Sequence, residues 1–183
     1  MWLRQRDGVT CGPSVAVTAG ALIDADYGAP LRGETDAARR WFAAEQGRVH
    51  RAVNRVWPRA LGTTPAGMAR ALSAHGIAYR WRPAGRSLSD VCAAVGSGKP
   101  VAMLIGGVIP RHWVLLTECD GSEADGPAIA GPASDGSDSG PSRFRCYDPA
   151  SGRVITVPVA AVRASRIAGL GFPRVFAFVL PAG

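Results

Sequence analysis

The apolar segments of this chain change character near residue 100, and that change restricts the folds open to it. Before this point they are rich in Ala and Gly and carry helix start and stop signals, which predict helices over residues 12–22, 35–46, 64–76 and 91–95. After it they are short and rich in β-branched and aromatic residues, which predicts strands over residues 101–105, 112–117, 143–147, 154–157 and 175–180. Helices that precede strands, rather than alternate with them, indicate an α+β fold.

The length and composition favour one domain with one long insertion. The chain has 183 residues, of which 47% are hydrophobic, enough for a substantial core. Residues 120–142 interrupt the strand region with Gly, Ser, Asp, Ala and Pro, a composition that buries little apolar surface. We therefore expect a single domain over residues 1–183, with a flexible loop over residues 120–142 inserted in a β-hairpin.

Basic residues give the chain a formal net charge of +7, but they are scattered along it. All but one of the 21 are Arg, with Lys99 the exception, which indicates the coding bias of a GC-rich genome. A nucleic-acid surface needs clustered basic residues with interleaved aromatic residues, so no nucleic-acid partner is expected. No apolar run is long enough to span a membrane, and the N-terminus lacks the apolar core of a signal peptide. We expect a cytoplasmic protein, or one exported without a classical signal peptide.

None of the four cysteines lies in a C-x-x-C pair, so the sequence predicts neither a metal site nor a cofactor. Cys92 lies among apolar residues of a predicted helix and is expected in the core. Strand alternation predicts that Cys119 and Cys146 point apart and form no disulfide.

Cys11 differs from the other cysteines because it stands at the start of a predicted helix, followed by Gly12 and Pro13. Unpaired backbone N–H groups and the positive end of the helix dipole favour the thiolate there. Gly12 is expected to leave room beside the sulfur for a substrate backbone. Gln5, six residues upstream, is expected to join the Cys11 N–H in stabilising an oxyanion.

A nucleophilic thiolate needs a proton partner, and the chain has three histidines. His50 and His75 are interpreted as surface residues, with a positive charge on His75 favoured at a helix end. His112 begins a predicted strand, a position that is rigid and can still face a cleft. If that strand pairs antiparallel with the next, Asp148 lies beside His112 and orients its imidazole. Trp113 is a candidate to cover the imidazole.

These residues together resemble a known family. Gln5, the Cys-Gly pair at Cys11, the strand that starts at His112 and the Tyr-Asp-Pro-Ala-Ser-Gly segment at 147–152 are similar to papain-like cysteine peptidases. More narrowly, they resemble the peptidases that cleave bacteriocin leaders after a double glycine, and their stand-alone bacterial relatives. The resemblance implies a papain-like fold, with an N-terminal helical part that carries the Cys and an antiparallel sheet that carries the His and Asp. It assigns Cys11, His112 and Asp148 to a catalytic triad and Gln5 to the oxyanion hole.

The sequence therefore predicts a cysteine peptidase that cleaves a peptide or protein substrate through an acyl-enzyme. The same triad also serves amidases, deamidases and acyltransferases, so cell-wall peptides and protein glutamines are alternative substrates. A non-catalytic papain-like domain that binds peptides is a further alternative. Taken singly, Cys11 is also compatible with a small core residue, and Asp148 before Pro149 with a turn.

Overall fold

The computed structural model describes residues 3–33, 35–54, 62–85, 87–120 and 142–183. The helices are α1 (Cys11–Ile23), η1 (Ala29–Leu31), α2 (Asp36–Val53), α3 (Pro65–Ser73), α4 (Ser89–Gly96) and α5 (Val159–Arg163). The strands are β1 (Tyr79–Pro83), β2 (Val101–Gly106), β3 (Pro110–Asp120), β4 (Arg143–Asp148), β5 (Arg153–Pro158) and β6 (Arg174–Pro181). Most helices precede most strands, so the predicted α+β class is confirmed.

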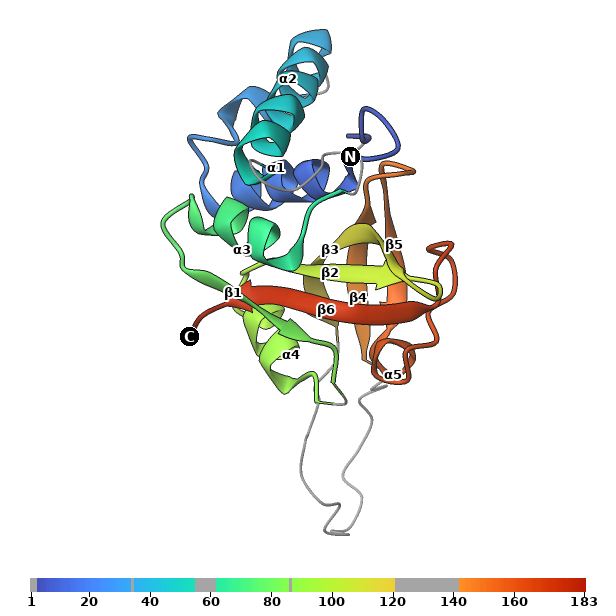
Figure 1. Cartoon of the computed structure of the whole chain (residues 1–183). Coiled ribbons are helices and arrows are strands. Elements are labelled where there is room, and N and C mark those ends of the chain that lie inside the picture. The colour runs from blue at the N-terminus through green and yellow to red at the C-terminus, as the bar shows by residue number, and fades with distance from the viewer. Residues whose placement is uncertain (1–2, 34, 55–61, 86, 121–141) are drawn as a thin grey trace, which may run out of the picture.

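One antiparallel sheet of six strands organises the molecule, in the order β1-β6-β2-β3-β4-β5 (Figure 1). The predicted antiparallel pairing of β3 with β4 is confirmed, and Leu115 lies opposite Tyr147. This register brings the start of β3 beside the end of β4. β1 was not predicted, because arginines interrupt its apolar pattern, and it pairs with β6 at the sheet edge.

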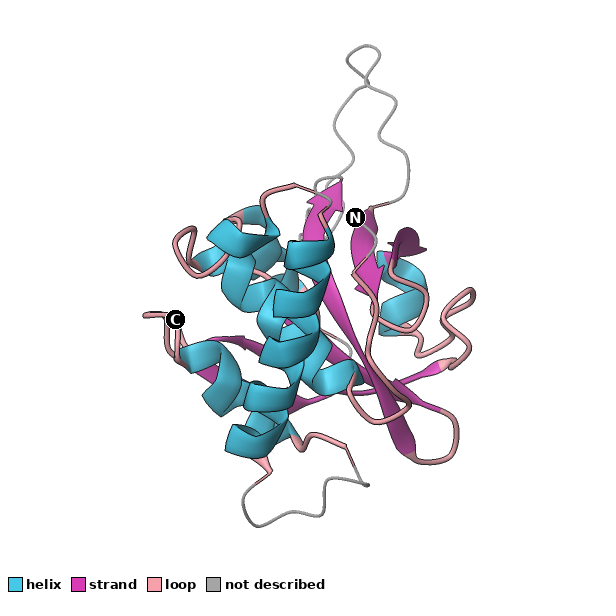
Figure 2. Cartoon of the chain, turned by 90° about the horizontal axis from the view of Figure 1, so that it is seen from above, coloured by secondary structure: helices cyan, strands magenta, loops and turns pink. Residues whose placement is uncertain are grey.

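Helices cover both faces of the sheet. α1, α2 and α3 pack on one face and α4 and α5 on the other, and Figure 2 shows the first group lying across the strands. β2 is buried along its whole length for this reason: Ala102 and Leu104 face the first group, and Val101, Met103 and Ile105 face the second. A central strand held from both sides is a rigid support for side chains at its neighbours' ends.

The predicted starts of the second and third helices are confirmed, the fourth helix begins at Ser89 rather than Val91, and one predicted helix end is wrong. Thr35 and Thr64 cap α2 and α3, because their hydroxyls accept the Ala38 and Gly67 N–H groups at 3.1 Å. The predicted end of the second helix near Gly47 is wrong, because α2 continues to Val53. Its apolar face extends past the glycine and is buried at every turn, through Ala38, Phe42, Gln46, Val49 and Val53.

The predicted orientation of Cys119 is also wrong. The pairing of β3 with β4 shifts between Leu116 and Glu118, so Cys119 lies opposite Phe144 and on the same face as Cys146. Strand alternation fails there because the bulge adds one residue to β3. On this face Cys119 approaches Cys92 of α4, with 3.7 Å between the two sulfur atoms. Cys92 packs against the core as predicted.

The insertion over residues 120–142 lies in a β-hairpin, because β3 ends at Asp120 and its antiparallel neighbour β4 begins at Arg143. The rest of that predicted loop falls outside the described residues. The single domain over residues 1–183 stays a prediction. No helix in the described ranges combines the length and apolar character that a membrane span needs.

Candidate active site

α1 begins at Cys11, and its first turn keeps backbone N–H groups available. No side chain among the described residues caps this helix at Thr10. The Thr10 hydroxyl is used elsewhere: it accepts the Arg6 and Asp7 N–H groups, each at 3.1 Å, and so shapes the turn that leads into α1. The N–H groups of Cys11 and Gly12, which no described side chain caps, and the helix dipole therefore favour negative charge on the Cys11 sulfur and on any oxygen bound beside it.

His112 and Asp148 form a close ion pair at the junction of β3 and β4. The distance from His112 Nε2 to Asp148 Oδ1 is 2.7 Å, and the two side chains are 8% and 13% exposed. Asp148 is held in turn by the β4–β5 hairpin, where its carboxylate accepts the Ala150 N–H at 3.0 Å and the Ser151 N–H at 3.2 Å. Asp148 thus starts a turn and contacts a histidine ring at the same time.

The surroundings shift both pKa values toward the charged forms. Burial disfavours the imidazolium of His112, but hydrogen bonds to Asp148 and Cys11 and the negative charges of both outweigh it and raise the pKa to about 9. Burial also opposes the charge on Asp148, yet the hydrogen bonds from His112, Ser151 and Ala150 lower its pKa to about 2. His112 is therefore protonated at neutral pH beside a carboxylate and the Cys11 sulfur.

Cys11 lines an open cleft, although its side chain is mostly buried. The residue is 6% exposed and lies at a hollow of about 250 Å³. The hollow is also lined by Gly62, Thr63, Thr64, Pro65, Leu104, Pro110, Arg111 and Trp113. A small ligand group can therefore reach the sulfur from this side.

Gln5 lies next to the turn that follows Asp148. Its backbone N–H donates to the Pro149 carbonyl at 2.8 Å, and its side-chain Nε2 donates to the Asp7 carbonyl at 2.8 Å. The amide nitrogen carries two hydrogens, so one remains for another acceptor. The structure thus brings His112, Asp148 and Cys11 into contact and places the backbone of Gln5 beside the same turn.

Two sequence expectations about neighbours of the site are wrong. A Cβ atom on Gly12 would lie 2.5 Å from Thr63 Oγ1, so this glycine makes room for the Thr63 segment rather than for substrate. Trp113 does not cover the imidazole: its Nε1 donates to the Thr63 carbonyl at 2.8 Å, on the opposite face of β3. The ring that lies near His112 is Phe172, with 6.0 Å between ring centroids.

The other two histidines are less exposed than predicted. His50 is 6% exposed because α2 continues through it. The His75 side chain is 11% exposed, and burial, the largest influence, lowers its pKa. The expected positive charge of His75 at a helix end is therefore wrong.

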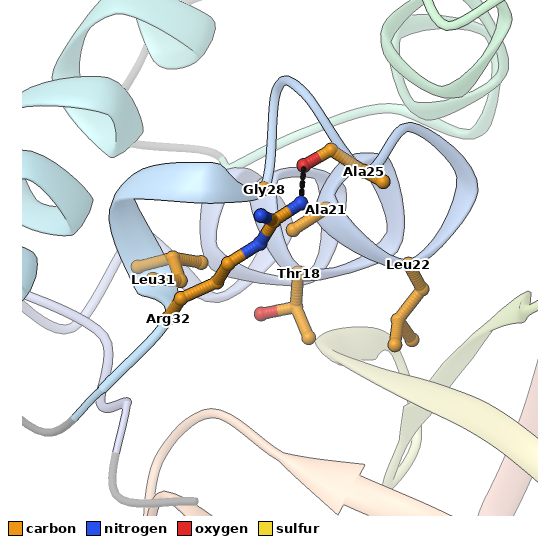
Figure 3. Close-up of a pocket in the computed structure, with 7 residues that line it drawn as sticks. All are labelled: Thr18, Ala21, Leu22, Ala25, Gly28, Leu31 and Arg32. Carbon is orange, nitrogen blue, oxygen red and sulfur yellow. Dashed lines mark hydrogen bonds between the residues drawn. The ribbon is translucent and has the colours of Figure 1, made fainter.

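A second hollow lies away from these groups, over the C-terminal half of α1. Its volume is about 220 Å³, and it is lined by Thr18, Ala21, Leu22, Ala25, Gly28, Leu31 and Arg32 (Figure 3). The Arg32 guanidinium donates to the Ala25 carbonyl at 3.2 Å across its mouth. Its described lining has no histidine, cysteine or carboxylate. Across the described residues there is also no group of three or more His, Cys, Asp and Glu side chains suited to a metal ion.

Comparisons with known proteins give a structural likeness but no sequence match. No family model matches the sequence, and no curated protein does either. Among solved structures, the chain is similar to a double glycine motif protease from an AMS/PCAT transporter in complex with the leader peptide, with 15% sequence identity and a TM-score of 0.45. That match covers 100% of this chain and 91% of the other. The function of this chain is therefore inferred from its own side chains.

Proposed function

We propose that the chain is a papain-like cysteine peptidase in which Cys11 is the nucleophile, His112 the proton carrier and Asp148 the residue that orients it. The observation that carries this proposal is the chain of contacts from Asp148 through His112 to Cys11 at an open cleft. Asp148 engages Nε2, which leaves Nδ1 of the same ring to exchange a proton with the sulfur. A carboxylate, an imidazole and a thiol in this order activate a nucleophile.

In the first half of the reaction the Cys11 thiolate attacks the carbonyl carbon of the scissile peptide bond. A carbon–sulfur bond forms, and the carbonyl oxygen takes the negative charge. The imidazolium of His112 then gives its proton to the leaving nitrogen as the carbon–nitrogen bond breaks. The amine product leaves, and the acyl group stays on Cys11 as a thioester.

In the second half water replaces the amine. Neutral His112 removes a proton from water, and the resulting hydroxide attacks the thioester carbon. The carbon–sulfur bond breaks, and the thiolate and imidazolium are restored. The Cys11 N–H and the second amide hydrogen of Gln5 are the proposed donors to the oxyanion in both halves.

The sharpest test uses a peptide library derived from a bacterial proteome and identifies the products by mass spectrometry. We expect new peptide termini with the wild-type chain and a loss of activity of about 10⁴-fold or more in Cys11→Ala, because the nucleophile is gone. Cys119→Ser is the matched control, since it removes a half-buried thiol at the far end of β3 and should keep full activity. Cleavage by Cys11→Ala at the wild-type rate would contradict the proposal.

The same mass spectra separate the peptidase from other reactions of this triad. Deamidation of glutamine adds about one mass unit without cutting the chain, and acyl transfer joins two peptides. Either product, lost in Cys11→Ala, would replace the peptidase by a deamidase or an acyltransferase on the same residues. A chain that leaves the library unchanged and does not react with iodoacetamide at Cys11 would be a binding domain instead.

A further inference from the structure

The segment that carries Gln5, residues 3–7, has no regular secondary structure, yet one side of it is fixed to β4 and the turn after it. The Tyr147 hydroxyl donates to the Leu3 carbonyl at 2.7 Å, and the Gln5 N–H donates to the Pro149 carbonyl at 2.8 Å. The Arg4 guanidinium donates to the Ala150 carbonyl at 3.0 Å. Figure 1 shows this first part of the chain beside the ends of the strands.

The other side of the segment contacts Gln46 of α2, which bonds to two of its backbone groups. Its Oε1 accepts the Arg6 N–H at 3.0 Å, and its Nε2 donates to the Arg4 carbonyl at 3.2 Å. The Arg6 N–H is shared with the Thr10 hydroxyl, at 3.1 Å. In an extended chain the carbonyl of one residue and the N–H of the residue two positions later point to the same side. The side-chain amide of Gln46 therefore bonds to the Arg4 carbonyl and the Arg6 N–H in the way that the backbone of a neighbouring strand would. The residue between the two bonded groups is Gln5.

The position of Gln46 in α2 is one where an apolar residue would otherwise be expected. It is fully buried, and it lies on the face of the helix that Phe42 and Val49 share. Burying a side-chain amide costs free energy unless its groups are hydrogen bonded. The two hydrogen bonds to residues 4 and 6 offset the free-energy cost of burying the Gln46 amide. A side chain that only filled space at this position would not need these polar groups.

We infer that Gln46 is a positioning residue for the proposed oxyanion site: it fixes the backbone on both sides of Gln5 and so sets the place from which the Gln5 side-chain amide acts. This inference rests on the proposed function, because it assigns a role within the same reaction. Gln46 acts through Gln5 and does not touch the reacting atoms. Cys11, His112 and Asp148 lie on α1, β3 and β4, whereas the Gln46 amide bonds to the segment that carries Gln5.

The test compares two reactions of the same thiol. Cleavage of the best peptide from the library passes through an oxyanion, whereas alkylation by iodoacetamide displaces iodide at a saturated carbon and forms none. We expect Gln46→Met, which keeps the volume and loses both bonds, to lower kcat by about 10- to 100-fold, less than complete loss of an oxyanion donor. KM and the alkylation rate of Cys11 should stay within about twofold of wild type. Val49→Ala, a core truncation one turn further along the same face, should leave kcat unchanged.

A double-mutant comparison separates positioning from general damage. If Gln46 acts through Gln5, Gln5→Ala combined with Gln46→Met should be no slower than Gln5→Ala alone. Multiplying effects, or an unchanged kcat in Gln46→Met, would overturn the inference. If Gln46→Met does not fold, Gln46→Glu decides instead: it keeps the shape and the acceptor for Arg6 and loses the donor to Arg4, so an intermediate kcat is expected and a wild-type kcat would overturn the inference.

The outcome for Cys11→Ala keeps the two proposals apart. If Cys11→Ala loses cleavage and Gln46→Met keeps the wild-type kcat, the inference about Gln46 is wrong and the proposal of a cysteine peptidase stands. Full cleavage by Cys11→Ala would remove the peptidase itself.

Discussion

The two ends of α1 each face a histidine and an aspartate, and the two pairs behave in opposite ways. At the N-terminal end, His112 Nε2 lies 2.7 Å from Asp148. At the C-terminal end, where Gly20 faces His75, the distance from His75 Nδ1 to Asp24 is 3.9 Å. The pKa of His112 is raised to about 9, whereas the pKa of His75 is lowered.

The helix dipole alone would give the reverse result, because it disfavours a positive charge at the N-terminal end of a helix and favours one at the C-terminal end. Burial, which disfavours the charged ring, is the largest influence at both sites. At His112 two close anionic partners overcome it. At His75 Asp24 is too distant to do so, and the positive charge of Arg48 adds to the lowering. Direct contact with an anionic partner therefore decides which histidine is charged.

The largest expected effect comes from changing the two aspartates in turn. Asp148→Asn should lower kcat by about 10³- to 10⁴-fold, because the asparagine no longer stabilises the imidazolium or fixes its tautomer. Asp24→Asn makes the same change at the other end of α1 and should leave kcat unchanged. Steady-state cleavage of the best library peptide measures both. Equal losses in the two variants would mean that the pairs do not differ in function.

Titration by NMR sharpens the comparison directly. One imidazole should titrate at about 9 and shift to lower pH in Asp148→Asn, and another should titrate below 6.5 and stay there in that variant. A common value near 6.5 for His112 and His75 would contradict the assigned contacts.

The two pKa shifts make the free energy of unfolding depend on pH in opposite ranges. A raised pKa means that the stabilisation from His112 is fully present below pH 6.5 and is lost as the pH rises through about 9, on the order of 3 kcal/mol in all. A lowered pKa means that the contribution of His75 is lost as the pH falls below 6.5. Denaturant unfolding of wild type and Asp148→Asn as a function of pH measures the alkaline loss, which should be smaller in the variant because its histidine lacks the carboxylate partner. An alkaline loss of stability of the same size in wild type and in Asp148→Asn would contradict the role of the His112–Asp148 pair.

The residues brought together at the N-terminal end of α1 were predictable because each has a local signal. Cys11 starts a helix, His112 starts a strand and Asp148 ends the next one, and antiparallel pairing of neighbouring strands then places the last two side by side. The same local rules fail where a tertiary contact decides. The charge of His75 was predicted from the helix end alone, and burial reverses it.

Other parts of the site have no local signal at all. Gln46 contacts a backbone 40 residues earlier, and Thr63 accepts a hydrogen bond from Trp113, 50 residues later. A glutamine within a helix is usually a surface residue, so its burial here could not be predicted before the packing of α2 was known. The bulge near Thr117 shifted Cys119 for a similar reason, since one extra residue in a strand leaves no mark on the apolar pattern.

The smallest expected effects come from alanine substitutions at two glycines of α1, one near each end of the helix. A Cβ on Gly12 would meet Thr63 Oγ1 at 2.5 Å and Trp113 Cδ1 at 3.2 Å, whereas a Cβ on Gly20 would meet His75 Nε2 at 2.5 Å. Both alanine variants should lower the free energy of unfolding by about 1–3 kcal/mol, because each overfills a packed contact. Only Gly12→Ala should also slow peptide cleavage, since the Thr63 segment that it displaces forms a wall of the Cys11 cleft. Slower cleavage in Gly20→Ala alone would show that the C-terminal end of α1 takes part in the reaction, and the two ends would no longer differ in role.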